Sequence, residues 1–205
     1  MKTDPVRAKR RLRAEIKEKA SRLDPDYVAF SDKNIAENVI NYAPFKSAAA
    51  LFCYVSMPGE PDTGDIIDAA LKSGKAVFVP YTEGDNMFAV PLKSRTALVP
   101  GRFNVPVPEP ADVKLTAEEL SGKYGKRLFC VIPCVTASPA GDRLGRGGGF
   151  YDRFLQKTGG FGGCVLVRHK LLAEDVPHGE KDVRIPAVAT ENGIIAIDTN
   201  QIPGV

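Results

Sequence analysis

Residues 141–153 combine residue types that bind phosphate groups. They read Gly-Asp-Arg-Leu-Gly-Arg-Gly-Gly-Gly-Phe-Tyr-Asp-Arg, so glycines and arginines alternate just before a helical pattern. Glycine lets a ligand approach the backbone closely, and the planar guanidinium group of arginine matches phosphate oxygens. The free N–H groups at the start of a helix also favour anions. The stretch therefore predicts a phosphate cradle for a nucleotide.

The same stretch supplies a carboxylate for a metal ion. Magnesium keeps several waters and takes one or two protein oxygens, so Arg143 and Arg146 would hold phosphate while Asp152 holds the metal. The stretch is not a Walker loop, because no Gly-Lys-Ser/Thr ends it, and Phe150 stands where a dinucleotide fingerprint needs its last glycine. Glycines alone would also fit a flexible connector, but the interleaved arginines favour a binding site.

Other chemistries find little support in the sequence. The histidines are His169 and His178, and no Gly-x-Ser-x-Gly elbow is present, so a nucleophilic hydrolase is not indicated. The four cysteines match no zinc or redox spacing and are expected to be buried free thiols. No apolar run has the length of a membrane span, and the first residues are charged, so we expect a soluble cytoplasmic protein.

The charge is concentrated at the start of the chain. The net charge is +3, yet residues 1–22 hold nine lysines and arginines against three acidic residues, which makes that segment +6. Its sparse apolar residues recur at roughly helical spacing, so it predicts a basic helix at about 5–23, with Asp4 as its cap and Pro5 at its first position. Such a segment indicates a local anionic partner, although a solvated basic face is the alternative.

Strand-like and helix-like segments alternate along the rest of the chain. Short apolar runs at 48–55, 75–80, 87–91, 127–133, 164–167 and 194–198 predict strands, and the segments up to about residue 41, 64–73 and 150–157 predict helices. The proline-rich residues 99–114 are expected to be extended and irregular and to cross the surface; they are the only plausible linker, but strand-like segments on both sides favour one continuous sheet. This alternation predicts one α/β domain over residues 1–205, a three-layer, Rossmann-like α/β/α arrangement with a mostly parallel, mixed sheet. Glu60 would lie in a loop after a parallel strand, where such folds bind ligands.

Four stretches resemble motifs of the 5-formyltetrahydrofolate cyclo-ligase (5,10-methenyltetrahydrofolate synthetase) family. The longest is RLGRGGGFYDR at residues 143–153, which is similar to the family signature. KRRLR at 9–13 resembles the Lys-x-x-Leu-Arg of its nucleotide-binding helix, and YVSMPGEPDT at 54–63 resembles its folate-contacting loop with a glutamate. Residues 177–182, followed by 190–193, resemble its C-terminal segment. The likeness spans nearly the whole chain.

The resemblance implies a ligase of one-carbon metabolism that depends on ATP and Mg²⁺. The family closes 5-formyltetrahydrofolate to 5,10-methenyltetrahydrofolate: ATP phosphorylates the formyl oxygen, N10 attacks, and ADP and phosphate are released. The implied catalytic residues are Arg146 and Arg143. The implied ATP-binding residues are Lys9, Arg10, Arg11, Leu12, Arg13, Arg143, Leu144, Gly145, Arg146, Gly147, Gly148, Gly149, Phe150 and Tyr151. The implied folate-binding residues are Val55, Glu60, Arg146, Gly147, Gly148, Gly149 and Phe150, and the implied magnesium ligands are Asp152 and Asp182.

The sequence also departs from the family pattern. Thr-Ala-Ser at 136–138 replaces an Ala-Phe-Asp, Phe150 replaces a tyrosine, Lys181 replaces a histidine, and Pro186 stands where a later aspartate is usual. A paralogue with the same ATP site and another folate or formamide-like substrate is therefore an alternative. A second alternative is a nucleic-acid-binding protein that uses residues 1–22, whose binding would weaken steeply with salt. The leading expectation is a reduced-folate substrate, no nucleic-acid or membrane partner, and a monomer or weak homodimer.

Overall fold

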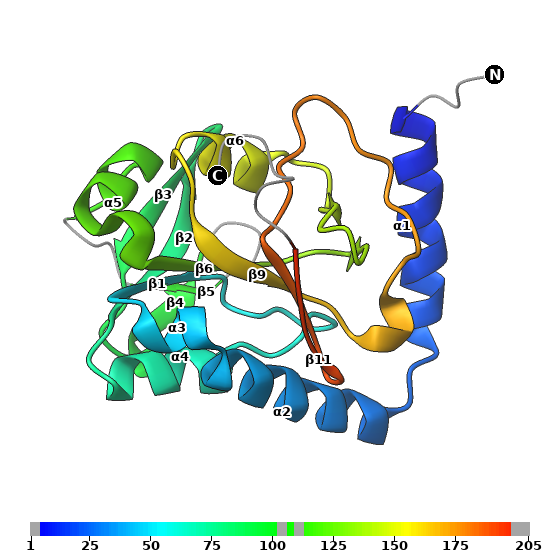
Figure 1. Cartoon of the computed structure of the whole chain (residues 1–205), viewed down its shortest axis with the longest axis horizontal. Helices are drawn as coiled ribbons and strands as arrows, with labels where there is room; N and C mark the ends of the chain where they lie inside the picture. The colour runs from blue at the N-terminus through cyan, green and yellow to red at the C-terminus, as the bar shows by residue number, and fades with distance from the viewer. Residues whose placement is uncertain (1–4, 102–105, 109–112, 198–205) are drawn as a thin grey trace.

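A mixed β-sheet forms the centre of the molecule (Figure 1). The computed structural model describes residues 5–101, 106–108 and 113–197. Within these residues the main sheet has seven strands in the order β11-β10-β9-β6-β1-β2-β3. Their bounds are β1 (Ala50–Cys53), β2 (Ala76–Glu83), β3 (Asn86–Pro91), β6 (Leu128–Ile132), β9 (Gly162–Leu166), β10 (Ala187–Thr190) and β11 (Gly193–Ala196).

The five inner strands, from β10 to β2, are parallel to one another. The outer strands β11 and β3 each run antiparallel to their neighbour, because a tight turn joins each pair. Gly84 makes the β2–β3 turn possible, since its φ of 58° is unfavourable for other residues. Parallel strands are covered on both faces, and every residue of β1 and β6 is buried accordingly.

Helices cover both faces of the sheet, which confirms the predicted three-layer arrangement (Figure 1). One face packs on α2 (Pro25–Asn41), α3 (Ala43–Ser47) and α4 (Gly64–Lys72), through Ile35, Val39, Phe45, Ile66 and Ile67. The other face packs on α5 (Ala117–Tyr124) and α6 (Phe150–Gln156), through Leu120, Phe154 and Leu155. Side chains alternate between the faces with the strand period of two, so Leu51 joins the first core and Phe52 the second.

The basic helix α1 (Pro5–Ser21) lies apart from these layers. It stands across the segments that follow the parallel strands (Figure 1) and is anchored by the buried Ile16. The helix ends at Ser21, slightly before the expected boundary, and the expected cap Asp4 lies outside the described residues. The following helix α2 begins as expected, because the carboxylate of Asp24 accepts hydrogen bonds from the N–H groups of Asp26 and Tyr27.

A topological switch point lies between β1 and β6. From β1 the chain continues through α4 to β2, whereas from β6 it continues through α6, on the opposite face, to β9. The loops that leave β1 and β6 therefore diverge and open a crevice at the carboxyl ends of the strands. Such crevices are where open α/β sheets bind ligands.

Where the structure describes residues 99–114 they are extended, as expected, but part of the segment is paired into strands and is not irregular. Residues at its start and in its middle pair as the antiparallel strands β4 (Leu98–Pro100) and β5 (Pro106–Pro108). Prolines are tolerated here because a two-stranded ribbon leaves outward N–H positions unpaired. A second small ribbon, β7 (Thr136–Ala137) with β8 (Arg143–Leu144), was not expected either. Three 3₁₀ turns complete the described elements, η1 (Arg95–Ala97), η3 (Gly125–Arg127) and η4 (His169–Leu171).

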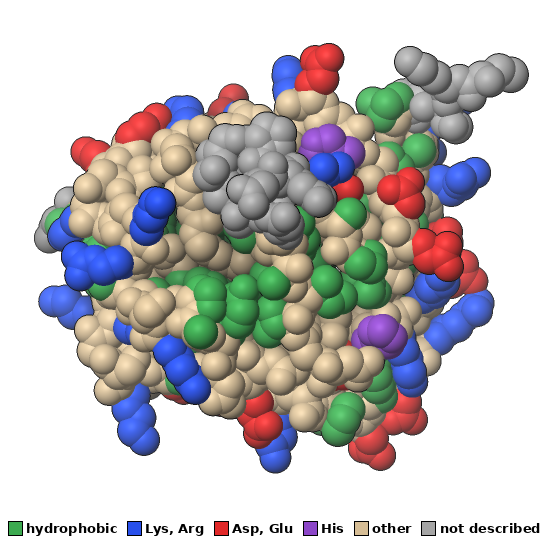
Figure 2. Space-filling view, in the orientation of Figure 1, with side chains coloured by type: hydrophobic (Ala, Val, Ile, Leu, Met, Phe, Trp, Pro, Cys, Tyr) green, Lys and Arg blue, Asp and Glu red, His purple; other side chains and the backbone are tan. Residues whose placement is uncertain are grey.

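The described surface mixes both signs of charge. In Figure 2, lysine, arginine, aspartate and glutamate side chains project around the rim of one face, and an apolar band crosses its middle where the edge strand β11 lies. No helix among the described residues combines the length and the apolar character needed to cross a membrane.

Candidate functional site

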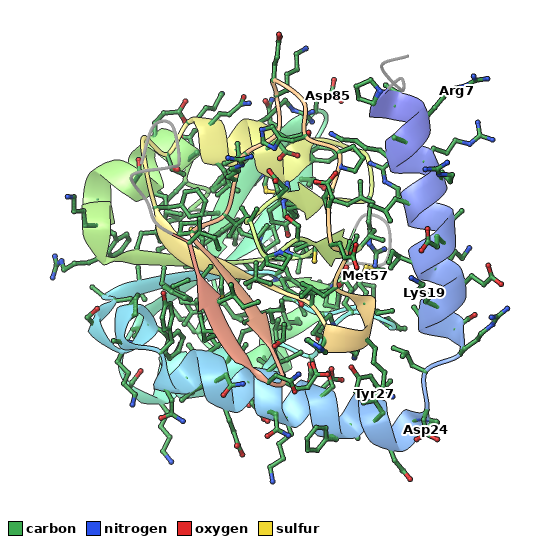
Figure 3. All side chains as sticks on the ribbon, turned by 45° about the vertical axis from the view of Figure 1, so that its right-hand side comes forward. Arg7, Lys19, Asp24, Tyr27, Met57 and Asp85 are labelled. Carbon is green, nitrogen blue, oxygen red and sulfur yellow. The ribbon has the colours of Figure 1, made fainter. Side chains whose placement is uncertain are left out.

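A cavity of about 1000 Å³ opens at the switch point, between the sheet and α1. Its size is at the upper end of the range for ligand pockets. Its walls come from α1, the loops after β1 and β6, the end of β2, the β4–β5 ribbon, and residues 143–152. Figure 3 shows Met57, from the loop after β1, between the sheet and α1, while Arg7 points away from the body of the molecule.

Most of the predicted site residues line this cavity. They are Lys9, Arg13, Val55, Glu60, Arg143, Leu144, Gly145, Arg146, Gly147, Gly148, Gly149, Phe150, Tyr151, Asp152 and Asp182. The predicted residues Arg10, Arg11 and Leu12 do not: both arginines are exposed on α1, and Leu12 packs against the core. The helical period explains the division, because Lys9 and Arg13 are four residues apart and share one face.

Opposite charges face one another across the cavity. The guanidinium of Arg146 lies 2.8 Å from the carboxylate of Glu60, and Lys9 is ion-paired with Asp182. Arg13 donates from Nε to the carbonyl oxygen of Gly145 at 2.8 Å, and no carboxylate of the described residues is in ion-pair contact with it. Four basic and three acidic side chains line the cavity, so an excess positive charge remains for an anion.

The two arginines of the signature have different environments. Arg146 has 60% of its side chain exposed and stands at the cavity, whereas Arg143 is only 3% exposed. Arg143 contacts Asp152 at 2.7 Å and donates to the carbonyl of Pro133 at 3.3 Å, while its Nε has no partner among the described residues. Arg143 therefore holds the start of α6 against the loop after β6, and only its edge reaches the cavity.

The glycine-rich loop keeps its backbone open to a ligand. Gly147 has a φ of 106°, and a β-carbon on it would point toward the guanidinium of Arg13, 3.7 Å away. The next residues are held from outside, because Arg153 donates to the carbonyls of Gly148 at 3.0 Å and Asp85 at 3.2 Å. Asp85 marks the β2–β3 turn in Figure 3. The loop thus offers bare backbone toward α1 and is fixed on its other side.

Asp152 contacts the segment that carries Asp182. The N–H of Val183, the residue after Asp182, donates to the carboxylate of Asp152 at 3.3 Å. Burial alone would raise the pKa of Asp182, but hydrogen bonds from Lys9 and from the N–H of Gly179 outweigh it and hold that pKa below its usual value. Among the described residues, no three or more His, Cys, Asp or Glu side chains form a metal-binding group. Mg²⁺ does not need one, because one or two carboxylates and substrate phosphates suffice.

The loop that carries Glu60 is ordered by its own hydrogen bonds. The Glu60 carboxylate is 11% exposed and accepts from the N–H of Met57 at 2.9 Å. The hydroxyl of Thr63 donates to the carbonyl of Tyr54 at 2.9 Å, and the Tyr54 hydroxyl donates to the carbonyl of Pro61 at 2.8 Å. Glu60 is therefore presented to Arg146 by a folded loop.

An apolar wall of the cavity was not anticipated. It consists of Pro80, Met87, Val99, Pro100, Val107 and Pro108. Pro80 comes from β2 and Met87 from β3. Both lie toward the carboxyl ends of the parallel strands, and this position could have predicted that they line the site. Cys134 also lines the cavity; it is a free thiol, as expected, but only partly buried, and its burial raises its pKa to about 12.

Comparison with known proteins places this geometry in context. The model of the 5-formyltetrahydrofolate cyclo-ligase family matches residues 5–191. The mitochondrial 5-formyltetrahydrofolate cyclo-ligase of Arabidopsis thaliana is 29% identical over 211 residues, which cover 92% of this chain and 76% of the relative. The 5-formyltetrahydrofolate cyclo-ligase of Escherichia coli is 29% identical over 190 residues, which cover 87% of this chain and 98% of the relative.

A solved structure shares the fold. The 5,10-methenyltetrahydrofolate synthetase of Aquifex aeolicus superposes with a TM-score of 0.76 at 22% identity, covering 92% of each chain. At this identity the similarity supports only the shared fold, and it agrees with the mixed, mostly parallel sheet described above.

Proposed function

The chain belongs to the 5-formyltetrahydrofolate cyclo-ligase family, a family of ligases, and from this premise we propose that it closes 5-formyltetrahydrofolate to 5,10-methenyltetrahydrofolate with ATP and Mg²⁺. One observation carries the proposal: Arg146, in the glycine-rich loop, is paired at 2.8 Å with Glu60, in the loop after β1. A single contact thus joins the part of the cavity suited to phosphate to the part suited to a second substrate.

Lys9, Arg13 and the backbone of the glycine-rich loop would bind the triphosphate. Lys9 and Arg13 face the loop from α1, and glycines leave room for phosphate oxygens near the backbone. Lys9 is paired with Asp182, and Arg146 is paired with Glu60. An incoming triphosphate would draw both cations away from these carboxylates. Asp182 would then be available to hold Mg²⁺ together with Asp152, which stays paired with Arg143, and the ion would neutralise phosphate charge.

Phosphorylation solves the chemical difficulty of this ring closure. An amide oxygen is a poor leaving group, so the formyl oxygen attacks the γ-phosphorus of ATP, an O–P bond forms, and the bond to ADP breaks. N10 then attacks the formyl carbon and loses its proton, and the C–O bond breaks to release phosphate. Arg146 is the exposed cation beside Glu60, so we assign it to the charge on the transferred phosphoryl group.

Glu60 and Val55 would bind the folate. An ionised carboxylate only accepts hydrogen bonds, so Glu60 would accept from N–H groups of the substrate once Arg146 turns toward phosphate. The apolar wall, with Pro80 and Met87, would cover an aromatic ring. Together these groups hold two reactants in one space, which is the main contribution the protein makes to a transfer of this kind.

The remaining expectations stay predictions. We propose a cytoplasmic protein with a single domain, a monomer or weak homodimer, and no nucleic-acid or membrane partner. Arg10 and Arg11 are exposed on α1 and have no place in the proposed ATP site.

A direct assay tests the proposal. Purified protein is mixed with 5-formyltetrahydrofolate and MgATP, and the near-ultraviolet absorbance of the methenyl product is followed. We expect an increase that needs ATP and is absent with a non-hydrolysable ATP analogue. No ATP-dependent increase at any substrate concentration would overturn the proposal.

A further inference from the structure

The loop at residues 56–63, here called the substrate loop, is a thin wall between two cavities. Met57 and Glu60 line the large cavity and also a second one of about 440 Å³ on the opposite side of the loop. The second cavity is lined on its far side by Leu23 and by α2. The conformation of the substrate loop therefore depends on contacts made on the side of the second cavity, outside the proposed reaction space.

Arg168 makes those contacts. It follows β9, is 3% exposed, and lies in the wall of the second cavity rather than the first. Its guanidinium donates to the carbonyl of Gly59 at 2.9 Å and to the carbonyl of Glu60 at 3.1 Å. The two carbonyls are adjacent to the turn at Gly59, whose φ is 91°. The fork of Arg168 thus fixes the backbone on both sides of the point from which the Glu60 side chain leaves.

Arg168 is itself held in place by α2. Its Nη2 lies 2.6 Å from the carboxylate of Asp32. The neighbouring backbone is fixed as well, because the N–H of His169 donates to Glu191 at 2.8 Å and the hydroxyl of Tyr27 donates to the same carboxylate at 2.5 Å. Tyr27 lies at the start of α2 in Figure 3. A chain of contacts therefore connects α2 to the substrate loop through one buried side chain.

We propose that Arg168, held by Asp32, is a positioning residue that sets the conformation of the substrate loop and thereby the affinity of the enzyme for its second substrate. This inference rests on the proposed function, in which Glu60 binds the folate. Arg168 acts through Glu60 and does not line the reaction space. No residue of the substrate loop binds phosphate in the proposed ATP site, and Arg146 leaves Glu60 when phosphate binds, so the larger effect should fall on the affinity for the folate.

The planar fork of arginine is what the arrangement requires. One guanidinium reaches two carbonyls and a carboxylate at once through separate N–H groups. A lysine at 168 would keep the charge beside Asp32, but a single ammonium group cannot reproduce the same planar set of contacts. The lysine variant therefore separates the charge of Arg168 from its geometry.

The experiment compares Arg168→Lys and Arg168→Met with the natural protein and with Lys75→Met. Lys75 is a matched control, because it also donates to two backbone carbonyls, of Lys46 at 2.9 Å and Ala48 at 2.7 Å, but at the opposite edge of the sheet. For Arg168→Met we expect KM for 5-formyltetrahydrofolate to rise about tenfold, equivalent to about 1.4 kcal/mol. KM for ATP should stay within about twofold. Arg168→Lys should give a smaller rise, and Lys75→Met none.

Hydrogen exchange gives a readout that needs no turnover. The amides of Met57 and Glu60 are hydrogen-bonded within the substrate loop, so they should exchange faster in the Arg168 variants and at the natural rate in Lys75→Met. If Arg168→Met does not fold, two variants replace it. One is Arg168→Lys, and the other is the double variant Asp32→Asn/Arg168→Met, in which both charges of the ion pair are removed. Unchanged exchange of the substrate loop, or equal rises in both KM values, would overturn the inference. If the natural protein lacks cyclo-ligase activity but the amides of the substrate loop still exchange faster in the Arg168 variants, only the proposed function would be overturned.

Discussion

Alanine substitution of Arg146 should lower turnover with little change in stability, whereas alanine substitution of Arg143 should lower stability. Arg146 is 60% exposed and its partner Glu60 keeps a second hydrogen bond, from the N–H of Met57. Only the Arg146 side of this ion pair is well exposed, so we assign the pair the upper end of the range for exposed pairs, about 1 kcal/mol. For a chain of this length 1 kcal/mol corresponds to roughly 2–4 °C in Tm. Arg146→Ala should therefore lower Tm by no more than about 4 °C.

The effect of Arg146→Ala on turnover should be far larger than its effect on Tm. A preorganised donor aimed at charge that develops in the transition state is worth about 10²–10³ in kcat, or about 2.7–4 kcal/mol at 1.36 kcal/mol per tenfold. We assign that place to Arg146, so Arg146→Ala should lose turnover by this factor while its melting curve stays nearly unchanged.

Arg143→Ala provides the contrast. Its side chain is 3% exposed and paired with Asp152 at 2.7 Å. Removing one partner of a buried pair is destabilising by about 3–5 kcal/mol, which corresponds to roughly 6–20 °C in Tm. The assays are differential scanning calorimetry and the absorbance of the methenyl product. A kcat for Arg146→Ala within tenfold of the natural value, or similar Tm losses in both variants, would refute the reasoning.

Two further predictions concern the carboxylate beside Lys9 and the packing of the sheet. The folded-state pKa of Asp182 lies below its unfolded value, so its stabilisation is present above about pH 3.9 and is lost as the pH falls through the folded pKa. Asp182→Asn should therefore flatten the dependence of Tm on pH below about pH 4, and an unchanged acid limb would contradict the role of Lys9. Gly163→Ala should lower the free energy of unfolding by about 1–3 kcal/mol in urea, because a β-carbon would come within 2.2 Å of the carbonyl oxygen of Cys130. The neighbouring Gly162→Ala, whose β-carbon would meet backbone at 3.5 Å, should have a smaller effect, and equal losses would show that the close contact is not the cause.

Local patterns in the sequence predicted the parts of the site that depend on local geometry. The glycines at 143–153 favour a loop because of their conformational freedom, and the arginines favour anion binding because of their charge. The structure places that loop at the cavity. The central strands were predicted for the same reason, since an apolar run such as Ala50–Cys53 is buried on both faces.

Contacts between distant segments could not be predicted in this way. Lys9 and Asp182 are 173 positions apart, and only the folded sheet brings α1 beside the segment after β9. The burial of Arg143 has the same origin, because it depends on how α6 packs. Strand β10 (Ala187–Thr190) was missed because four apolar or small residues between polar segments give no clear period.

The most direct test of the account follows the formyl oxygen itself. Substrate labelled with ¹⁸O in the formyl group is incubated with the protein and MgATP, and the label is measured in the phosphate that is released. If Arg146 and Glu60 join a phosphoryl donor to the folate in one cavity, one labelled phosphate should appear for each methenyl product formed. Product without ATP, or product with the label in water rather than in phosphate, would contradict the account.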